Sequence, residues 1–368
     1  MKKIFDRLQV ILLATVILCL ALSCVLIPDR QLSEKENRSL TQLPAFSVEK
    51  LFSGEYTSQL GVYIADQFVM RDSFVKGKAY FELLQNKSEN NGVIYTKDAL
   101  ITRPSNFVSR LTDNLDCIDE FAKDNSLSVT VVPLPRLADV FDEYLPKSYP
   151  ASLDFSVWQQ FYKETDNRNF AVADLYKQLC NSNEYYKTDH HYTTHGAFMV
   201  YKALGDKLGY TPMDKNYFNI KCVADDFEGT SMRTSGFYDF EKDKIHLYRY
   251  SGDDNYTVVA DSNDIQLYDF SKLETIDKYA VFLGGNHARV DITKKNENRE
   301  KLLIIRDSYA DSLVPFLAIH FDITLIDLRY YTDSVAKLAK DNNISKVLVL
   351  ESIEELVTAK NLSYLRMK

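Results

Sequence analysis

The sequence predicts a mixed α/β domain in which helices cover both faces of a parallel sheet. Two observations indicate this class. Short runs of Val, Ile and Leu alternate with amphipathic stretches of helical period along much of the chain, and this alternation is typical of parallel sheets. The chain also has 368 residues, of which 45% are hydrophobic, enough to bury the core of one large domain.

The chain begins with an apolar segment that basic residues precede. Lys2, Lys3 and Arg7 stand before a stretch without charged residues over 10–27. A helix of this length is just long enough to cross the hydrocarbon core of a bilayer. The basic residues favour an orientation with the N-terminus inside and the rest of the chain outside.

Three interpretations of this segment stay open: an uncleaved anchor, a cleaved signal peptide, and a lipoprotein signal that ends at Cys24. The residues at 21–23 fit poorly to a cleavage site, which requires small side chains. We therefore expect a signal-anchor over 1–28, formed by an N-terminal transmembrane helix. The anchor predicts a single-pass protein of the cell membrane, and in all three cases the bulk of the chain works outside the cytoplasm.

The next region, 29–90, is expected to form a stalk and a group of helices. Residues 29–45 are polar and of mixed charge, without a clear period. Over 47–85, apolar residues recur at helical spacing, and Gly54 and Gly61 interrupt the pattern. Two or three helices are predicted there.

The remaining residues, 91–368, carry the α/β alternation. We expect a short hairpin at 92–101, then strands at 127–132, 170–173, 302–305, 323–327 and 346–350. The expected helices lie at 107–123, 154–165, 193–208, 309–319 and 333–340, with a terminal helix from 353. Within this domain, 215–283 is predicted to be a β-rich insertion or an antiparallel extension, because strand patterns at 244–250, 256–259 and 279–282 have no long helix between them.

Composition excludes several classes of function. The net charge is −8 and no sustained basic patch occurs, so a nucleic-acid partner is not expected. Of the five cysteines, two lie in the N-terminal apolar segment and the others, Cys117, Cys180 and Cys222, are widely spaced. This pattern indicates neither a disulfide framework nor a zinc site. No cofactor is expected.

The most informative motif for function lies at 186–195. It holds three of the six histidines, with Asp189 two residues before His191. A neutral imidazole accepts a proton near pH 7, and a nearby carboxylate fixes its tautomer and stabilises the imidazolium. An isolated Asp-x-His pair also occurs by chance and often caps a turn, but such a turn does not explain the cluster.

A base of this kind requires a nucleophile, and Ser308 is the best candidate. It follows a buried apolar strand through Arg306 and Asp307, at the edge where α/β sheets present functional side chains. At the start of a helix, free backbone N–H groups can stabilise an oxyanion. The alternative is that Asp307 or Ser308 serves only as a helix N-cap.

Metal binding is the main alternative for the histidines. His191 and His195 would share one face of a helix that starts early enough, as in zinc peptidases. Tyr192 stands where those motifs have glutamate. Asp189 or His190 could supply a third ligand, but adjacent residues seldom both reach one ion, and we therefore assign no metal.

Two further segments follow predicted strands. Gly285 and Asn286 precede the serine strand; paired glycines allow close backbone approach, and an asparagine amide can donate to an oxyanion. A tight turn is the alternative. Arg136 follows the strand at 127–132 and is a candidate for substrate binding, with a surface salt bridge as the alternative.

These motifs together resemble the DHHW family, which is related to the AlgX/AlgJ-type alginate O-acetylation proteins with an SGNH-hydrolase-like fold. The resemblance covers nearly the whole chain after residue 28. It rests on the segments Thr188–Tyr192, Leu303–Tyr309, Glu36–Arg38, Phe52–Tyr56, Asp66–Phe68, Arg71–Asp72 and Gly285–Asn286.

The resemblance implies an SGNH-like domain outside the cytoplasm with a metal-free triad of Ser308, His191 and Asp189. Two residues depart from the family pattern. Tyr192 replaces the tryptophan of the family's name, and Arg306 replaces the glycine of the Gly-Asp-Ser motif of typical SGNH enzymes. Both are therefore grouped with the residues expected around the oxyanion and the substrate.

The expected function is an O-acetyltransferase or O-acetylesterase that acts on acetyl esters of a cell-surface or exported polysaccharide. The expected partners are this polysaccharide, a membrane-bound protein that donates acyl groups, and the membrane itself. A catalytically inactive glycan-binding or assembly protein of the same fold is the alternative. The single tryptophan, Trp158, gives no obvious platform for stacking sugars.

Overall fold

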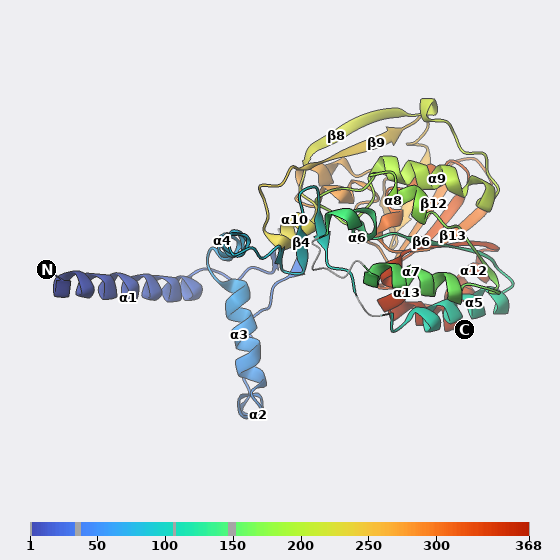
Figure 1. The fold of residues 1–368 in the computed structure, drawn as a ribbon. Helices are drawn as coiled ribbons and strands as arrows, with labels where there is room; N and C mark the ends of the chain where they lie inside the picture. Colours follow the sequence, from blue (N-terminus) through green and yellow to red (C-terminus); the bar gives the residue numbers. More distant parts are fainter. Residues whose placement is uncertain (1, 34–37, 106–107, 146–151, 368) are drawn as a thin grey trace. The chain divides into compact units, whose positions relative to one another are not determined.

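The computed structural model describes residues 2–33, 38–105, 108–145 and 152–367 (Figure 1). The chain divides into two compact units. One comprises Met1–Asn90 together with Arg233–Tyr238, and the other comprises Asn91–Met232 together with Asp239–Lys368.

The first unit is mainly helical. Its elements are α1 (Lys2–Leu26), β1 (Leu32–Ser33), β2 (Arg38–Ser39), α2 (Val48–Phe52), α3 (Glu55–Gln67), α4 (Arg71–Leu84) and β3 (Glu89–Asn90). Strands β1 and β2 pair antiparallel. The three helices α2 to α4 agree with the helical spacing at 47–85, and Ser47 caps α2 by accepting from Lys50 N. Glu36 and Asn37, which contribute to the family resemblance, lie outside the described residues.

The expected transmembrane helix is not found. The N-terminal residues are helical, as α1. However, none of the helices in the described part of the chain has the length and apolar character that crossing a membrane requires.

The second unit is built on a sheet of eight strands in the order β11-β10-β12-β14-β13-β15-β6-β7. The strands are β6 (Ser128–Leu134), β7 (Phe170–Val172), β10 (Tyr256–Ala260), β11 (Asn263–Ile265), β12 (Arg289–Lys294), β13 (Lys301–Arg306), β14 (Asp322–Ile326) and β15 (Lys346–Ser352). The five strands from β14 to β7 are parallel, and the other three are antiparallel to their neighbours. All five strands of the parallel part were expected from their apolar sequences.

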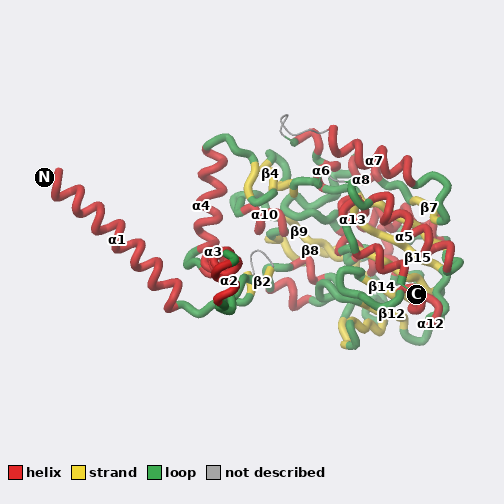
Figure 2. The backbone as a smooth tube through the Cα atoms, turned by 90° about the horizontal axis from the view of Figure 1, so that it is seen from below, coloured by secondary structure: helices red, strands yellow, loops and turns green. Residues whose placement is uncertain are grey.

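Helices cover both faces of this sheet (Figures 1 and 2). In β13, Leu302 and Ile304 pack on one face while Leu303 and Ile305 pack on the other, because side chains alternate along a strand. The first face is covered by α9 (Thr194–Leu208) and α11 (Val314–Leu317). The second is covered by α5 (Leu111–Asp124), α7 (Ser152–Glu164), α12 (Val335–Asp341) and α13 (Ile353–Thr358). The mixed α/β class is therefore confirmed.

The predicted β-rich region adopts both of the expected forms. Strands β8 (Asn219–Phe227) and β9 (Asp243–Arg249) form a separate antiparallel pair with irregular register. Strands β10 and β11 extend the main sheet. A second small pair, β4 (Val93–Tyr95) with β5 (Leu100–Thr102), is the hairpin expected at 92–101.

Short helices complete the unit. They are α6 (Leu137–Val140) and α8 (Tyr176–Cys180), and the 3₁₀ turns η1 (Asp142–Tyr144), η2 (Lys215–Tyr217), η3 (Phe270–Glu274), η4 (Lys278–Val281), η5 (Ser308–Ala310) and η6 (Asn361–Arg366). The helix α10 (Thr230–Ser235) begins in this unit, whereas its residues from Arg233 onward belong to the first unit.

Two local predictions were wrong, and one strand of the main sheet, β12, was missed. Residues 279–282 form the 3₁₀ turn η4 and an isolated bridge in place of a strand. The helix predicted at 309–319 is broken into η5 and α11, because Pro315 favours the first turn of a new helix. Strand β12 was not predicted, since its sequence alternates charged and apolar residues next to a polar loop.

Candidate functional site

Ser308 lies at the carboxyl edge of the parallel sheet. Strand β13 ends at Arg306, and Asp307 then caps η5 by accepting from Tyr309 N at 3.0 Å. The second oxygen of Asp307 accepts from Ser352 N, at the end of the neighbouring β15, at 2.8 Å. Asp307 therefore fixes the turn, which leaves Ser308 half-buried with its hydroxyl free for another partner. The expected N-cap role belongs to Asp307.

The loop between α8 and α9 carries Asp189 and His191. A bridge between Tyr185 and Tyr192 closes the base of this loop, with Tyr186 N donating to His191 O at 3.1 Å. Thr193 then caps α9 by accepting from Gly196 N at 3.1 Å. The loop is therefore held at both ends, and the side chains of Asp189 and His191 within it are buried.

The structure brings Ser308, His191 and Asp189 together. His191 Nε2 lies 2.7 Å from Ser308 Oγ, and His191 Nδ1 lies 2.5 Å from Asp189 Oδ1. An ionised carboxylate only accepts hydrogen bonds, so Nδ1 carries the proton and Nε2 is the acceptor for the serine hydroxyl. This is the order of groups that activates a serine nucleophile.

Asp189 is held by the backbone as well as by His191. Its Oδ1 also accepts from His191 N at 3.1 Å, and its Oδ2 accepts from Thr230 N at 2.6 Å. Burial would raise the pKa of this carboxyl, but the two neighbouring imidazoles and these hydrogen bonds lower it well below its usual value. Asp189 therefore stays ionised over the pH range in which a histidine base works.

Three tyrosines frame the histidine. The Tyr279 ring stacks on His191 with ring centres 4.1 Å apart and planes at 11°, and its hydroxyl lies 3.2 Å from Ser308 O. Tyr192 donates to Tyr309 O at 2.6 Å, and Tyr309 donates to His190 O. The Tyr192 hydroxyl thus supports the backbone beside Ser308. The sequence reasoning gave neither Tyr279 nor Tyr309 a role, although Tyr309 ends the segment Leu303–Tyr309, because a pattern does not show which rings meet in space.

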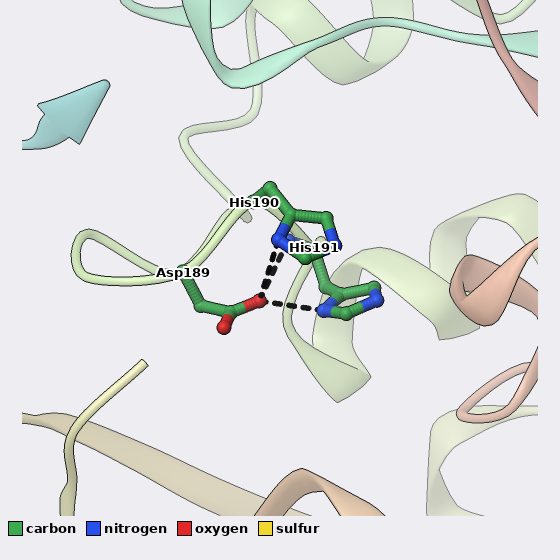
Figure 3. A group of neighbouring side chains, drawn as sticks. All are labelled: Asp189, His190 and His191. Carbon is green, nitrogen blue, oxygen red and sulfur yellow. Dashed lines mark hydrogen bonds and ion pairs between the residues drawn. The ribbon is translucent and has the colours of Figure 1, made fainter. Parts of the chain in front are cut away.

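His190 is adjacent to His191 but differs from it in its contacts. Its Nδ1 lies 3.6 Å from Asp189 Oδ1, and Figure 3 shows both imidazoles turned towards the same carboxylate oxygen. Burial and the neighbouring His191 lower the pKa of His190 to about 4. His190 is therefore neutral at pH 7.

The structure gives a different set of candidate metal ligands from the pair that the sequence suggested. His195 is directed to Tyr248, with Nδ1 2.5 Å from the hydroxyl, so the predicted pair of His191 and His195 is not formed. Asp189, His190 and His191 instead offer three ligand atoms within 4.8 Å of one another. The shared oxygen of Asp189 is already the partner of His191 Nδ1, so an ion there would compete with the hydrogen bond that orients the base.

Asn286 follows Gly284 and Gly285, whose φ values of +78° and +114° explain why glycine is needed. The side chain of Asn286 is exposed, and its Oδ1 lies 3.3 Å from Arg306 Nη1 and 3.5 Å from Arg329 Nη2. Arg306 is fully buried behind it. The sequence did not indicate Arg329.

Arg136 forms a local ion-pair network. Its guanidinium contacts Asp139 at 3.0 Å and Glu354 at 3.2 Å, and its backbone N–H donates to the Asp139 carboxylate at 2.7 Å. Arg136 is buried as the N-cap of α6. The salt bridge that the sequence left as an alternative is thus observed, buried rather than on the surface.

Comparison with known proteins identifies the family that these motifs resemble. The model of the DHHW protein family matches residues 154–326. This stretch includes Asp189, His191 and Ser308. The predicted resemblance is therefore confirmed. No curated protein matches the sequence significantly.

Solved structures share the fold. A DHHW family protein from Eubacterium siraeum is 22% identical with a TM-score of 0.60, and the match covers 76% of this chain and 96% of that one. Bacillus cereus PatB1 with a sulfonyl adduct is 19% identical with a TM-score of 0.64, covering 75% and 98%. A weaker likeness, with 16% identity and a TM-score of 0.48, is to the O-acetyltransferase domain of Pseudomonas putida AlgJ, covering 74% and 98%.

Proposed function

We propose that this protein, whose central residues match the DHHW family, is a serine-dependent O-acetyltransferase or O-acetylesterase of SGNH type. Its substrates are acetyl esters of a polysaccharide. The observation that carries the proposal is the hydrogen-bonded chain from Ser308 Oγ through His191 to Asp189, with contacts of 2.7 Å and 2.5 Å. The contact between His191 and Ser308 joins residues 117 positions apart, and a structural N-cap would not require it.

The mechanism follows from the order of these groups. His191 Nε2 takes the proton of Ser308 as Oγ attacks the acetyl carbonyl, and Asp189 stabilises the imidazolium that forms. The Ser308 backbone N–H and the Asn286 amide hold the oxyanion. The ester C–O bond then breaks and His191 returns its proton to the leaving oxygen, which yields an acetyl-serine.

A second attack completes the reaction. A sugar hydroxyl or water gives its proton to His191 and attacks the acetyl carbonyl. The bond between that carbonyl carbon and Ser308 Oγ then breaks, and His191 returns the proton to Oγ, which restores Ser308. Transfer to a sugar makes the protein a transferase, and transfer to water makes it an esterase. Exclusion of water from the half-buried serine decides between the two.

The partners and the compartment are part of the proposal. We place the reaction outside the cytoplasm, with a cell-surface or exported polysaccharide as one partner and a membrane-bound acyl donor protein as the other. The basic residues and apolar stretch at the N-terminus support export. PatB1, whose fold this chain shares, was solved with a sulfonyl adduct. Because sulfonyl reagents react with activated nucleophiles, this likeness supports an activated nucleophile here.

The test combines a sulfonyl fluoride probe with turnover of a chromogenic acetyl ester. We expect covalent labelling of the wild-type protein at Ser308 and none in Ser308→Ala. Turnover should fall by about 10³-fold or more in Ser308→Ala and His191→Ala, because triad members act as a unit.

His195→Ala is the matched control, since His195 contacts Tyr248 instead of the triad. Equal turnover in the wild type and both triad variants would reject the proposal. Folded wild-type protein that binds polysaccharide without labelling or turnover would favour the inactive glycan-binding alternative.

A further inference from the structure

A buried network of two arginines and two aspartates lies behind Asn286. The side chain of Arg306 is 0% exposed, and its Nη1 lies 3.3 Å from Asp311 Oδ1 and 3.7 Å from Asp327 Oδ2. Arg329, 35% exposed, donates to the same Asp327 oxygen at 2.6 Å. Asp327 therefore holds the two guanidinium groups on the same side of Asn286.

Both guanidinium groups face the carbonyl oxygen of the Asn286 amide. Nη1 of Arg306 and Nη2 of Arg329 lie 3.3 Å and 3.5 Å from Asn286 Oδ1. Arginine offers only donors, so an amide turned by 180° would place its NH₂ group against two other donors. The orientation with Oδ1 towards the arginines is therefore fixed by charge, and the NH₂ group faces the opposite way.

This NH₂ group is available to a substrate. Within the described part of the chain, Asn286 Nδ2 has no hydrogen-bond partner, and the side chain is exposed. Arg306, which contacts the other side of this amide, stands two residues before Ser308 in the chain. We propose that Arg306 and Arg329 are positioning residues that orient Asn286 Nδ2 towards the oxyanion of the acetyl-transfer reaction.

The network is costly for the fold, which supports a role in the site. Arg306 Nε and Nη2 are buried without a hydrogen-bond partner among the described residues, and unmade bonds of buried donors destabilise a protein. The β13 strand itself does not require arginine at position 306. The contacts of its guanidinium with Asp311, Asp327 and Asn286 explain why arginine stands there.

The inference rests on the proposed function. The variant Asn286→Asp is the sharpest test of the inference. The carboxylate keeps the shape of the amide and still accepts from both arginines, so the unfolding midpoint should be unchanged or higher. It has no donor, however, and it places negative charge beside the oxyanion. We expect kcat to fall by about 10²–10³-fold, the range for loss of one oxyanion donor, with KM changed little.

Arg329 provides the test of positioning, because this partly exposed side chain can be changed more safely than the buried Arg306. We expect Arg329→Gln to lower kcat by about tenfold, below the effect of losing the donor itself, and Arg329→Lys to recover part of the loss. If Arg329 acts through Asn286, the double variant Arg329→Gln/Asn286→Asp should be no slower than Asn286→Asp alone. Arg366→Gln is the control, since it removes an arginine that pairs with Asp113 and Glu120.

The outcomes separate the inference from the proposed function. Activity of Asn286→Asp within threefold of the wild type, or multiplicative losses in the double variant, would overturn the inference while Ser308→Ala stays inactive. Full activity in Ser308→Ala would instead remove the proposed function, and with it the reaction that these arginines serve.

Discussion

Two adjacent histidines show how strongly a residue's role depends on its contacts. His190 and His191 both approach Asp189 Oδ1, at 3.6 Å and 2.5 Å. Only His191 also reaches Ser308 Oγ. The sequence indicated that one of the clustered histidines could act as a base. The directions of the side chains in the structure show that His191 is the one placed to do so.

The two histidines should therefore respond differently to mutation. His191→Ala removes the base and should lower kcat/KM by at least about 10²–10⁴-fold, the contribution of a general base. His190→Ala keeps the backbone carbonyl that accepts from Tyr309 and should retain activity within about tenfold, well short of that loss. Steady-state kinetics with an acetyl ester measures both, and an equal loss in the two variants would contradict the assignment.

At the scale of elements, the ends of neighbouring strands and one loop build the site. The parallel strands β14, β13 and β15 end side by side, which places Asp327, Asp307 and Ser352 at one edge of the sheet. The loop before α9 then brings His191 to this edge. Gly229, which precedes α10, packs closely against that loop.

Gly229→Ala tests this packing. An added Cβ would lie 2.4 Å from both Thr188 O and Asp189 Cβ, closer than real Cβ contacts, so the loop would have to move. Small displacements of catalytic groups cost about 10²-fold in rate, and we expect a loss of that order in ester turnover.

The matched control is Gly77→Ala, in α4, where the added Cβ meets no atom within 4 Å. Alanine there should leave turnover unchanged and stabilise the helix slightly, by roughly 0.5–1 kcal/mol. Turnover of Gly229→Ala equal to that of this control would show that the loop tolerates the displacement.

At the scale of the whole molecule, buried carboxyls should make stability depend on pH. Burial raises the pKa of Asp311 to about 7, although Arg306 acts in the opposite direction. Burial also raises the pKa of Glu351 well above its usual value. At these two carboxyls the folded protein therefore binds more protons than the unfolded chain between pH 4 and 7, so their contribution to the free energy of unfolding should fall as pH rises through this interval.

Asp311→Asn should flatten this dependence, because the amide does not titrate. The shift in the pKa of Asp311 corresponds to a change in unfolding free energy on the order of 4 kcal/mol. This shift already includes the opposing effect of Arg306. Urea unfolding at pH 4.5, 6.0 and 7.5 measures the slope in the wild type and the variant. The exposed Asp214→Asn serves as the control, and parallel curves for wild type and Asp311→Asn would exclude the buried carboxyl as the cause.

The sequence by itself determined the mixed α/β class, the five strands of the parallel sheet, and the candidates Ser308, His191 and Asp189. It could do so because apolar runs and helical periods depend on neighbours along the chain, and because Asp-x-His and strand–Asp–Ser are local patterns. The break at 309–319 was missed although Pro315 favours the first turn of a new helix. The turn at 279–282 was missed because its apolar sequence resembles a strand, whereas in the fold the Tyr279 ring stacks on His191.

Only the tertiary structure decided which residues meet. It placed His191 on Ser308 across 117 positions, turned His195 away to Tyr248, and engaged Arg136 in buried ion pairs. It also revealed the contacts of Tyr279, Tyr309 and Arg329, to which the sequence assigned no role. The physical reason is that hydrogen bonds and ring contacts act over a few ångströms in space, whereas patterns in a single sequence record only distances along the chain.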